Sequence, residues 1–170
     1  ALFLQEISHL INAFVVGDGE ETLVELLRKE RAGASWDDIP GVWLPGKEKS
    51  YRDRPAQKNL DAFIAPSFNE FDLNDYLNKT EGLIAEWSRG CVGHCLFCAF
   101  KTASGSFRAR SPQQILASIR YYAEKYGAKH ISLVDSAVNG DPCLLEKTCD
   151  LLISAGLGVK FSGLAIPKKD

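Results

Sequence analysis

Three cysteines within eight residues constrain this chain more than any other feature of its sequence. Cys91, Cys95 and Cys98 place thiols at spacings of four and three. Such spacing suits metal ligation better than a disulfide framework, and the total of five cysteines is odd. Three thiolates can converge on one centre, and three ligands on a 4Fe-4S cubane leave one iron without a protein ligand.

A zinc site is the alternative metal centre, and it needs a fourth ligand from elsewhere in the chain. His94 lies between two of the cysteines and is expected to face solvent. Cys143 and Cys149 are six residues apart on a predicted helix, hence on different faces, and we interpret them as buried free thiols. A zinc-stabilised interaction module and a non-catalytic iron-sulfur carrier therefore stay open as alternatives.

Strands and helices are expected to alternate around the cysteines. Apolar runs predict three strands, and helical spacing of apolar residues predicts two helices between them. The ranges are 83–87, 130–135 and 159–163 for the strands, and 112–127 and 142–155 for the helices. This α/β order predicts three parallel strands side by side, with the helices packed outside them and the cysteines directly after the first strand.

The first 80 residues follow a different plan. Residues 2–12 are expected to end a helix, and residues 13–16 form a short strand before a turn at Gly17 and a helix that stops by Gly33. Residues 34–80 contain four prolines and are expected to be a linker that wraps over the next domain. Within that linker, Val42 to Leu44 and Ser50 to Arg52 are expected to pair as a hairpin around a Pro-Gly turn.

Charge and hydropathy exclude some partners. The formal net charge is -2, and neither sign gathers into a run that would track phosphates, so no nucleic-acid partner is indicated. No apolar stretch approaches the roughly 20 residues that span a bilayer, and no signal peptide is evident, so no membrane partner is expected and we predict a cytoplasmic protein. The chain contains no Met and begins at Ala1, which suggests a piece of a longer protein.

The cysteine motif resembles the signature of the radical S-adenosylmethionine (radical SAM) superfamily, CxxxCxxC with an aromatic residue just before the last cysteine. The resemblance implies that Cys91, Cys95 and Cys98 bind a 4Fe-4S cluster whose open iron is chelated by the amino and carboxylate groups of SAM. Electron transfer from the reduced cluster then cleaves SAM to a 5'-deoxyadenosyl radical. The resemblance also implies that Phe97 contacts the adenine.

Further segments are similar to the cobalamin-binding-domain subgroup of that superfamily. They are residues 15–22 with the sequence VVGDGEET, Ser88-Arg89-Gly90-Cys91, and Arg108-Ala109-Arg110-Ser111-Pro112. The similarity implies that residues 1–33 end a Rossmann-like cobalamin-binding domain, 34–80 form the linker, and 81–170 form the first half of a partial (β/α)6 barrel. It implies that Asp135 and Ser136, after the second strand, receive the SAM amino group.

The resemblance also implies what the whole protein does. It would be a radical SAM enzyme acting on a small-molecule or peptide substrate, with a reductant such as flavodoxin or ferredoxin. Methyl transfer through methylcobalamin, radical rearrangement and ring formation stay open, and this 170-residue chain is expected to be catalytically incomplete. For Arg108 and Arg110 we favour a structural role over contact with SAM.

Overall fold

The computed structural model describes residues 6–77, 82–100 and 104–167, without the side chains of residues 75 and 76. The chain forms two compact units, Ala1–Gln57 and Lys58–Asp170. The helix expected over residues 2–12 lies partly outside the described ranges, which contain the 3-10 helix η1 (Ser8–Leu10). The division at residues 33 and 80 stays a prediction.

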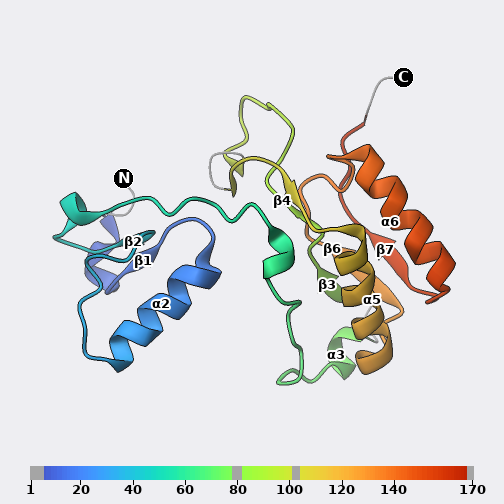
Figure 1. Cartoon of the computed structure of the whole chain (residues 1–170), viewed down its shortest axis with the longest axis horizontal. Coiled ribbons are helices and arrows are strands. Elements are labelled where there is room, and N and C mark those ends of the chain that lie inside the picture. The colour runs from blue at the N-terminus through green and yellow to red at the C-terminus, as the bar shows by residue number, and fades with distance from the viewer. Residues whose placement is uncertain (1–5, 78–81, 101–103, 168–170) are drawn as a thin grey trace. The chain divides into compact units, whose positions relative to one another are not determined.

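In the first unit, a helix packs beside a two-stranded antiparallel sheet (Figure 1). Strand β1 (Phe14–Val15) pairs with β2 (Val42–Trp43), and α2 (Gly19–Arg31) follows β1. The turn between β1 and α2 contains Gly17 at φ +86°, a conformation that glycine adopts without steric cost. The strand, turn and helix expected at this end of the chain are therefore present.

The hairpin predicted around Pro45-Gly46 is wrong. The turn itself exists, because Lys47 N donates to Leu44 O at 3.1 Å, but β2 pairs with β1 and not with residues 50–52. The chain after the turn enters the 3-10 helix η2 (Glu48–Ser50), which cannot supply a strand. The β1–β2 pairing also brings the Phe14 and Trp43 rings together edge to face at 5.5 Å.

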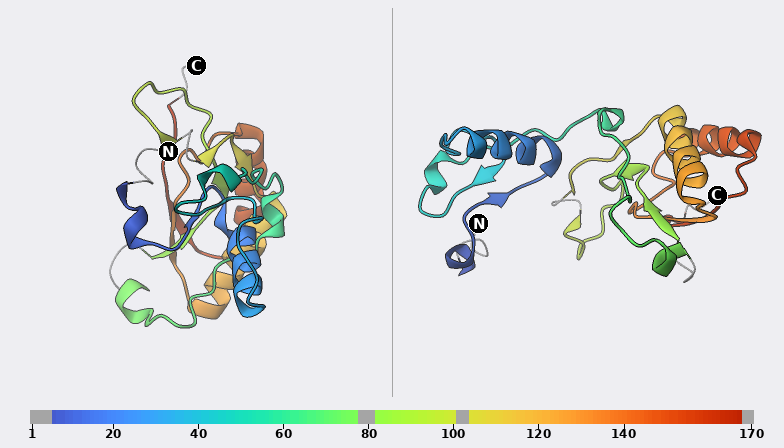
Figure 2. Two further views of the ribbon diagram at one scale, coloured as in Figure 1. Left: turned by 90° about the vertical axis from the view of Figure 1, so that its left-hand side faces the viewer. Right: turned by 90° about the horizontal axis from the view of Figure 1, so that it is seen from below.

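The second unit contains the expected parallel sheet. Its strands are β3 (Leu83–Ala85), β6 (His130–Leu133) and β7 (Lys160–Ser162), in the order β3-β6-β7. Helices α5 (Pro112–Tyr126) and α6 (Pro142–Ala155) connect these strands and contact each other. Both helices cover the same face of the sheet (Figure 2).

Local sequence sets the ends of these two helices. The Ser111 hydroxyl accepts a hydrogen bond from Gln114 N at 3.2 Å, and Asp141 does the same for Leu144 N at 3.1 Å. In each helix a proline occupies the first turn, where its missing N–H costs nothing. Gly127 and Gly156 then end the helices at φ +66° and +60°.

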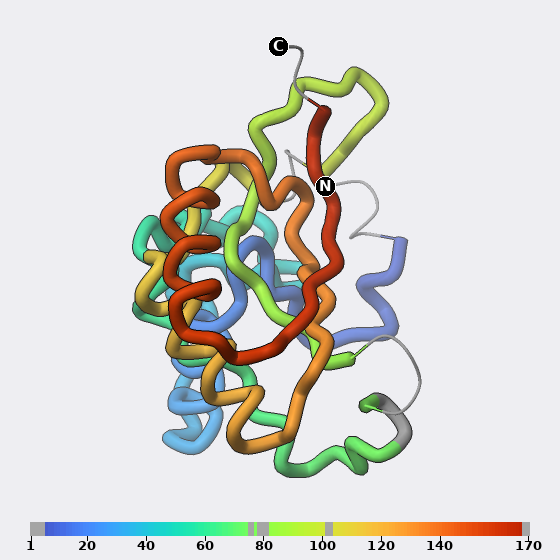
Figure 3. The backbone as a smooth tube through the Cα atoms, turned by 90° about the vertical axis from the view of Figure 1, so that its right-hand side faces the viewer, coloured from blue at the N-terminus to red at the C-terminus, as the bar shows by residue number. Residues whose placement is uncertain are grey.

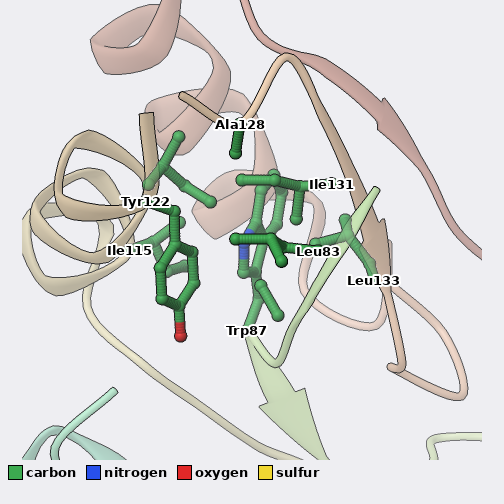
Figure 4. Close-up of a cluster of buried hydrophobic side chains, with 9 residues drawn as sticks. Leu83, Trp87, Ile115, Tyr122, Ala128, Ile131 and Leu133 are labelled. Atoms are coloured by element: carbon green, nitrogen blue, oxygen red, sulfur yellow. The ribbon is translucent and has the colours of Figure 1, made fainter. Parts of the chain in front are cut away.

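The core of the second unit lies between the sheet and the two helices (Figure 4). Alternate strand residues face it, and the opposite sheet face carries exposed apolar side chains such as Ile84 and Val134. The core side chains from strands and loops are Leu83, Ala85, Trp87, Ala128, Ile131 and Leu133, and those from α5 are Ile115, Ile119 and Tyr122. This packing fixes the strand ends from which the cysteine-bearing loop emerges.

The second unit also contains short elements. Residues 58–77 include the 3-10 helix η3 (Leu60–Ala62) and the helix α3 (Asn74–Leu77), and further along the chain β4 (Ser88–Arg89) pairs antiparallel with β5 (Arg108–Ala109). No helix among the described residues is both long and apolar enough to cross a bilayer.

Arg110 anchors the η3 segment. It is only 4% exposed, and its guanidinium donates to Leu60 O at 2.9 Å and to Phe63 O at 2.7 Å. Both bonds come from Nη1, and Nη2 lies 3.8 Å from a Glu86 carboxylate oxygen. These contacts confirm the structural role favoured for Arg110.

Replacing Arg110 with methionine is expected to destabilise the second unit. The change removes the Arg110 donor from Phe63 O and one of the donors to Leu60 O, which still accepts from Phe63 N. A buried acceptor that loses its partner costs about 1–3 kcal/mol, so with the weakened Leu60 contact we expect a loss of about 2–3 kcal/mol. Urea denaturation followed by circular dichroism measures it. The matched control is Arg120→Met on the exposed side of α5, and an equal loss in both variants would contradict the anchoring role.

Candidate metal centre

The cysteine loop, residues 91–98, begins directly after β4 and lies beyond the carboxyl ends of the parallel strands (Figure 3). In the same view the segment that follows β7 runs beside it. Cys91 is partly buried, Cys95 and Cys98 are exposed, and all three are free thiols. The loop thus presents its sulfur atoms at the edge of the sheet where parallel α/β folds place their ligands.

Two of the three sulfur atoms flank one glycine. A Cβ atom added at Gly93 would lie 3.3 Å from Cys91 Sγ and 3.9 Å from Cys95 Sγ, and the Gly93 N–H already points at Cys91 Sγ at 3.3 Å. Cys98 is turned back toward Cys95 by a backbone hydrogen bond of 3.2 Å from its N–H to Cys95 O. The local backbone therefore brings Cys91 and Cys95 together and folds Cys98 toward them.

The donor set fits a soft metal centre. Thiolates are the preferred ligands of iron-sulfur clusters and of zinc, and an exposed loop with no side chain at Gly93 leaves room beside the sulfur atoms. Within the described ranges no three Cys, His, Asp or Glu side chains are already close enough to hold a metal. Binding would therefore require the three thiols to move closer together.

Three residues are the candidates for a fourth ligand: His94 on the loop, and Cys143 and Cys149 on α6. His94 is exposed on the loop, as expected. Cys143 and Cys149 are also exposed, so their prediction as buried thiols is wrong. The side of α6 that faces the core carries Leu145, Thr148 and Leu152, and Cys149 lines an apolar cavity beside Leu145 and Leu152.

Phe97 stands out from the loop. Its side chain is 93% exposed, and its neighbour Leu96 is fully exposed. Exposed apolar groups that lie together gain free energy when a ligand or another protein surface covers them. Phe97 is therefore free to pack on a ligand bound at the cysteines, and its assignment to the adenine stays a prediction.

Asp135 and Ser136 reach the segment that leads into the cysteine loop. Asp135 is 2% exposed, and its oxygens accept from Trp87 N at 3.1 Å and from Ser88 Oγ at 2.5 Å. Burial raises the pKa of the Asp135 carboxyl, although these hydrogen bonds oppose the shift. Ser136 Oγ donates to Gly90 O at 2.6 Å, so both residues lie against the strand that precedes Cys91.

Sequence reasoning missed Asn139. Its side-chain amide donates to Ile166 O at 2.7 Å and accepts from Ile166 N at 2.9 Å, as a paired strand would. The Ile166 side chain then lies 3.8 Å from the Cβ position at Gly93. An asparagine in the loop after a strand was the only signal for this contact, and it did not identify a partner 27 residues away.

Gly90 is required immediately before the first cysteine. Its φ is +79°, and a Cβ atom there would stand 2.3 Å from Ser106 O. We expect Gly90→Ala to cost about 1–3 kcal/mol from the backbone conformation alone, with the clash displacing Cys91 as well. Gly105→Ala is the matched control, since Gly105 has φ +72° but open space around its Cβ position.

Metal loading separates the two glycine variants. Both should unfold at a lower urea concentration, but only Gly90→Ala should also bind less metal. Equal metal loading in both variants would show that the position of the Gly90 backbone does not affect the thiols.

The comparisons with known proteins concern the same region. Residues 86–162 match the family model described as Radical SAM superfamily. An anaerobic magnesium-protoporphyrin IX monomethyl ester cyclase of Synechocystis sp. is 19% identical over 156 residues, which are 90% of this chain and 31% of the cyclase. The chain thus spans about a third of the length of that curated relative.

Two solved structures share the fold across both units. The cobalamin-dependent SAM radical enzyme OxsB, with aqua-cobalamin and SAM bound, has a TM-score of 0.67 at 20% identity, over 94% of this chain and 23% of that one. The radical SAM methyltransferase TsrM from Kitasatospora setae, with cobalamin and a [4Fe-4S] cluster bound, has a TM-score of 0.64 at 16% identity, over 89% and 31%.

Proposed function

We propose, from the membership of residues 86–162 in the radical SAM superfamily, that this chain binds a 4Fe-4S cluster through Cys91, Cys95 and Cys98 and holds SAM at its open iron. One observation carries the proposal most strongly. The three thiols of the superfamily motif lie free on one loop, past the carboxyl ends of the parallel strands, with Cys91 and Cys95 on either side of Gly93.

The residues of the site have separate roles in binding the cluster and SAM. The three cysteines would bind iron as thiolates, and the absence of a side chain at Gly93 avoids a tight contact with Cys91 Sγ, which would lie 3.3 Å from a Cβ atom there. Phe97 packs against the adenine of SAM, which covers an aromatic ring that is otherwise exposed. Ser136 lies close enough to the loop for its oxygen to accept a hydrogen bond from the SAM amino group, while the burial of Asp135 favours a different task.

Cys91, Cys95 and Cys98 would hold the cluster, which would supply one electron for cleavage of SAM to methionine and a 5'-deoxyadenosyl radical, and a reductant such as flavodoxin or ferredoxin would supply that electron to the cluster. The chain's own part is to hold SAM against the open iron and to shield it from water. The apolar side chains around the loop, Val92, Leu96 and Phe97, suit that shielding once a ligand covers them.

The radical SAM match also suggests an architecture for the two units. Residues 81–170 would form the first half of a partial (β/α)6 barrel, and the exposed sheet face that carries Ile84 and Val134 would be its interior. Residues 1–33 would end a Rossmann-like cobalamin-binding domain, with 34–80 as the linker. The matches of OxsB and TsrM over both units support this proposal, and we assign no residue of the first unit to cobalt.

The reaction of the whole protein is proposed only as a class. It would be a cytoplasmic radical SAM enzyme acting on a small molecule or a peptide. Ring formation has the named cyclase relative in its favour, and cobalamin-dependent methyl transfer has the likeness to the methyltransferase TsrM. A non-catalytic iron-sulfur or zinc-binding module is the competing function.

Metal analysis tests the proposal. After anaerobic reconstitution with iron and sulfide, the chain should contain about four iron and four sulfide atoms and show the broad visible absorption of a 4Fe-4S cluster. Purified protein with one equivalent of zinc that iron cannot replace would contradict the proposal and favour the zinc module.

A further inference from the structure

The strand that leads to Cys91 is tied to the loop after β6 by side chains. Trp87 N and Ser88 Oγ donate to the two oxygens of Asp135, at 3.1 and 2.5 Å. Ser136 Oγ donates to Gly90 O at 2.6 Å. These bonds join residues that are 46 to 48 positions apart in the sequence, so they hold two separate parts of the fold together.

The ties occur where the backbone ladder ends. Strand β3 pairs with β6 as far as Ala85, and Val134 N then donates to Ala85 O at 3.0 Å. Beyond that point the chain leaves β6, because Trp87 O accepts from Arg110 N and Ser88 pairs with Ala109. The Asp135 carboxylate supplies the acceptor that Trp87 N would otherwise lack in a buried position.

We propose that Asp135 is a positioning residue for Cys91, supported by Ser136: together they fix residues 87–90 and so set where the first thiol of the cysteine loop stands. This inference rests on the proposed function of Cys91 as a cluster ligand. It differs from the role that the family resemblance implies for Asp135, which is a direct bond to the SAM amino group.

Burial and geometry favour the indirect role. Asp135 is 2% exposed and each of its oxygens already accepts a hydrogen bond from residues 87–88. Burying a carboxylate is unfavourable unless hydrogen bonds compensate it, and here the compensating donors belong to the segment before the cysteines. Gly90 completes the same segment, since its contact with Ser106 allows no side chain.

Two substitutions of Asp135 distinguish a positioning role from a direct ion pair with SAM. Asp135→Ala removes both acceptors. Asp135→Asn keeps the shape: its oxygen can accept from Trp87 N, and its amide can donate to Ser88 Oγ. A positioning role therefore predicts that asparagine restores what alanine loses, whereas a direct ion pair with the SAM ammonium predicts that both variants fail to bind SAM.

Hydrogen exchange of the metal-free chain gives a readout that does not depend on the cluster. In Asp135→Ala the backbone amides of residues 87–91 should exchange about tenfold faster than in the parent. The segment can then open locally without breaking the hydrogen bonds from Trp87 N and Ser88 Oγ to Asp135. Asp135→Asn should exchange like the parent. Ser154→Ala, which removes a hydroxyl bond of 2.7 Å to Asp150 O on α6, is the matched control and should leave residues 87–91 unchanged.

The reconstituted proteins complete the test. Asp135→Ala should bind less than half the iron of the parent, and its remaining cluster should show an altered midpoint potential, while Asp135→Asn matches the parent in both. If Asp135→Ala does not fold, Ser88→Ala and Ser136→Ala each remove a single bond and should show the same changes to a smaller degree.

Two results would overturn the inference. One is unchanged exchange at residues 87–91 in Asp135→Ala. The other is an asparagine variant that keeps its cluster but no longer binds SAM, which would restore the direct role. A parent chain that takes up no iron would overturn the proposed function, and with it the cluster part of the inference, while the exchange data would still decide whether Asp135 fixes the segment before Cys91.

Discussion

Cys95→Ala should abolish cluster binding while leaving the free energy of unfolding within about 0.5 kcal/mol of the parent. Cys95 is exposed, so the fold does not depend on its side chain. The cluster does depend on it, because loss of one of three thiolates leaves two irons without a protein ligand. Iron and sulfide analysis after reconstitution, together with visible absorption, measures the loss.

Cysteines outside the loop provide the control for this prediction. Cys143 and Cys149 are also exposed and unpaired with another cysteine, but they lie on α6. Cys143→Ala and Cys149→Ala should keep the full iron content. Loss of iron in either of them, or its retention in Cys95→Ala, would mean that the ligand set is not the one proposed.

Ile131→Ala should have the largest effect on stability, about 2–5 kcal/mol. Ile131 is 0% exposed in the central strand β6, where it faces the α5 side chains and pairs in register with Leu83 and Phe161 (Figure 4). The substitution removes apolar contacts and leaves a cavity. The cavity cannot close, because β6 is fixed between the neighbouring strands β3 and β7. Urea denaturation followed by circular dichroism measures the loss.

An exposed isoleucine tests whether burial is the cause. Ile153 on α6 is 77% exposed, and Ile153→Ala makes the same chemical change at a position that contributes little packing. It should alter the free energy of unfolding by no more than about 0.5 kcal/mol. If the two variants are equally destabilised, the assigned core of the second unit is incorrect.

The regular elements of the second unit were predictable because their signals are local. Ser111, Pro112 and Gly127 identify both ends of α5 within a few residues of sequence. Apolar runs of strand length separated by such helices imply a parallel sheet, and β3-β6-β7 confirms it. The three-cysteine motif is local in the same sense, and the family match over residues 86–162 confirms the resemblance drawn from it.

The errors and omissions involve contacts between distant residues. The Pro45-Gly46 turn is real, yet Val42 and Trp43 pair with β1, a strand some 28 residues earlier in the sequence, and not with the segment after the turn. Periodicity on α6 could not tell which cysteine faces out, because that depends on how the helix lies on the sheet. The bonds of Asp135 to residues 87–88 likewise depend on where β3 leaves β6, which no local pattern encodes.

Electron paramagnetic resonance of the reduced, reconstituted chain, recorded with and without SAM, tests the open-iron site most directly. We expect a reduced 4Fe-4S signal whose g-values shift when SAM is added, because SAM binds at the iron that the three cysteines leave open. A reduced 4Fe-4S signal that saturating SAM leaves unchanged would contradict an open-iron site formed by Cys91, Cys95 and Cys98.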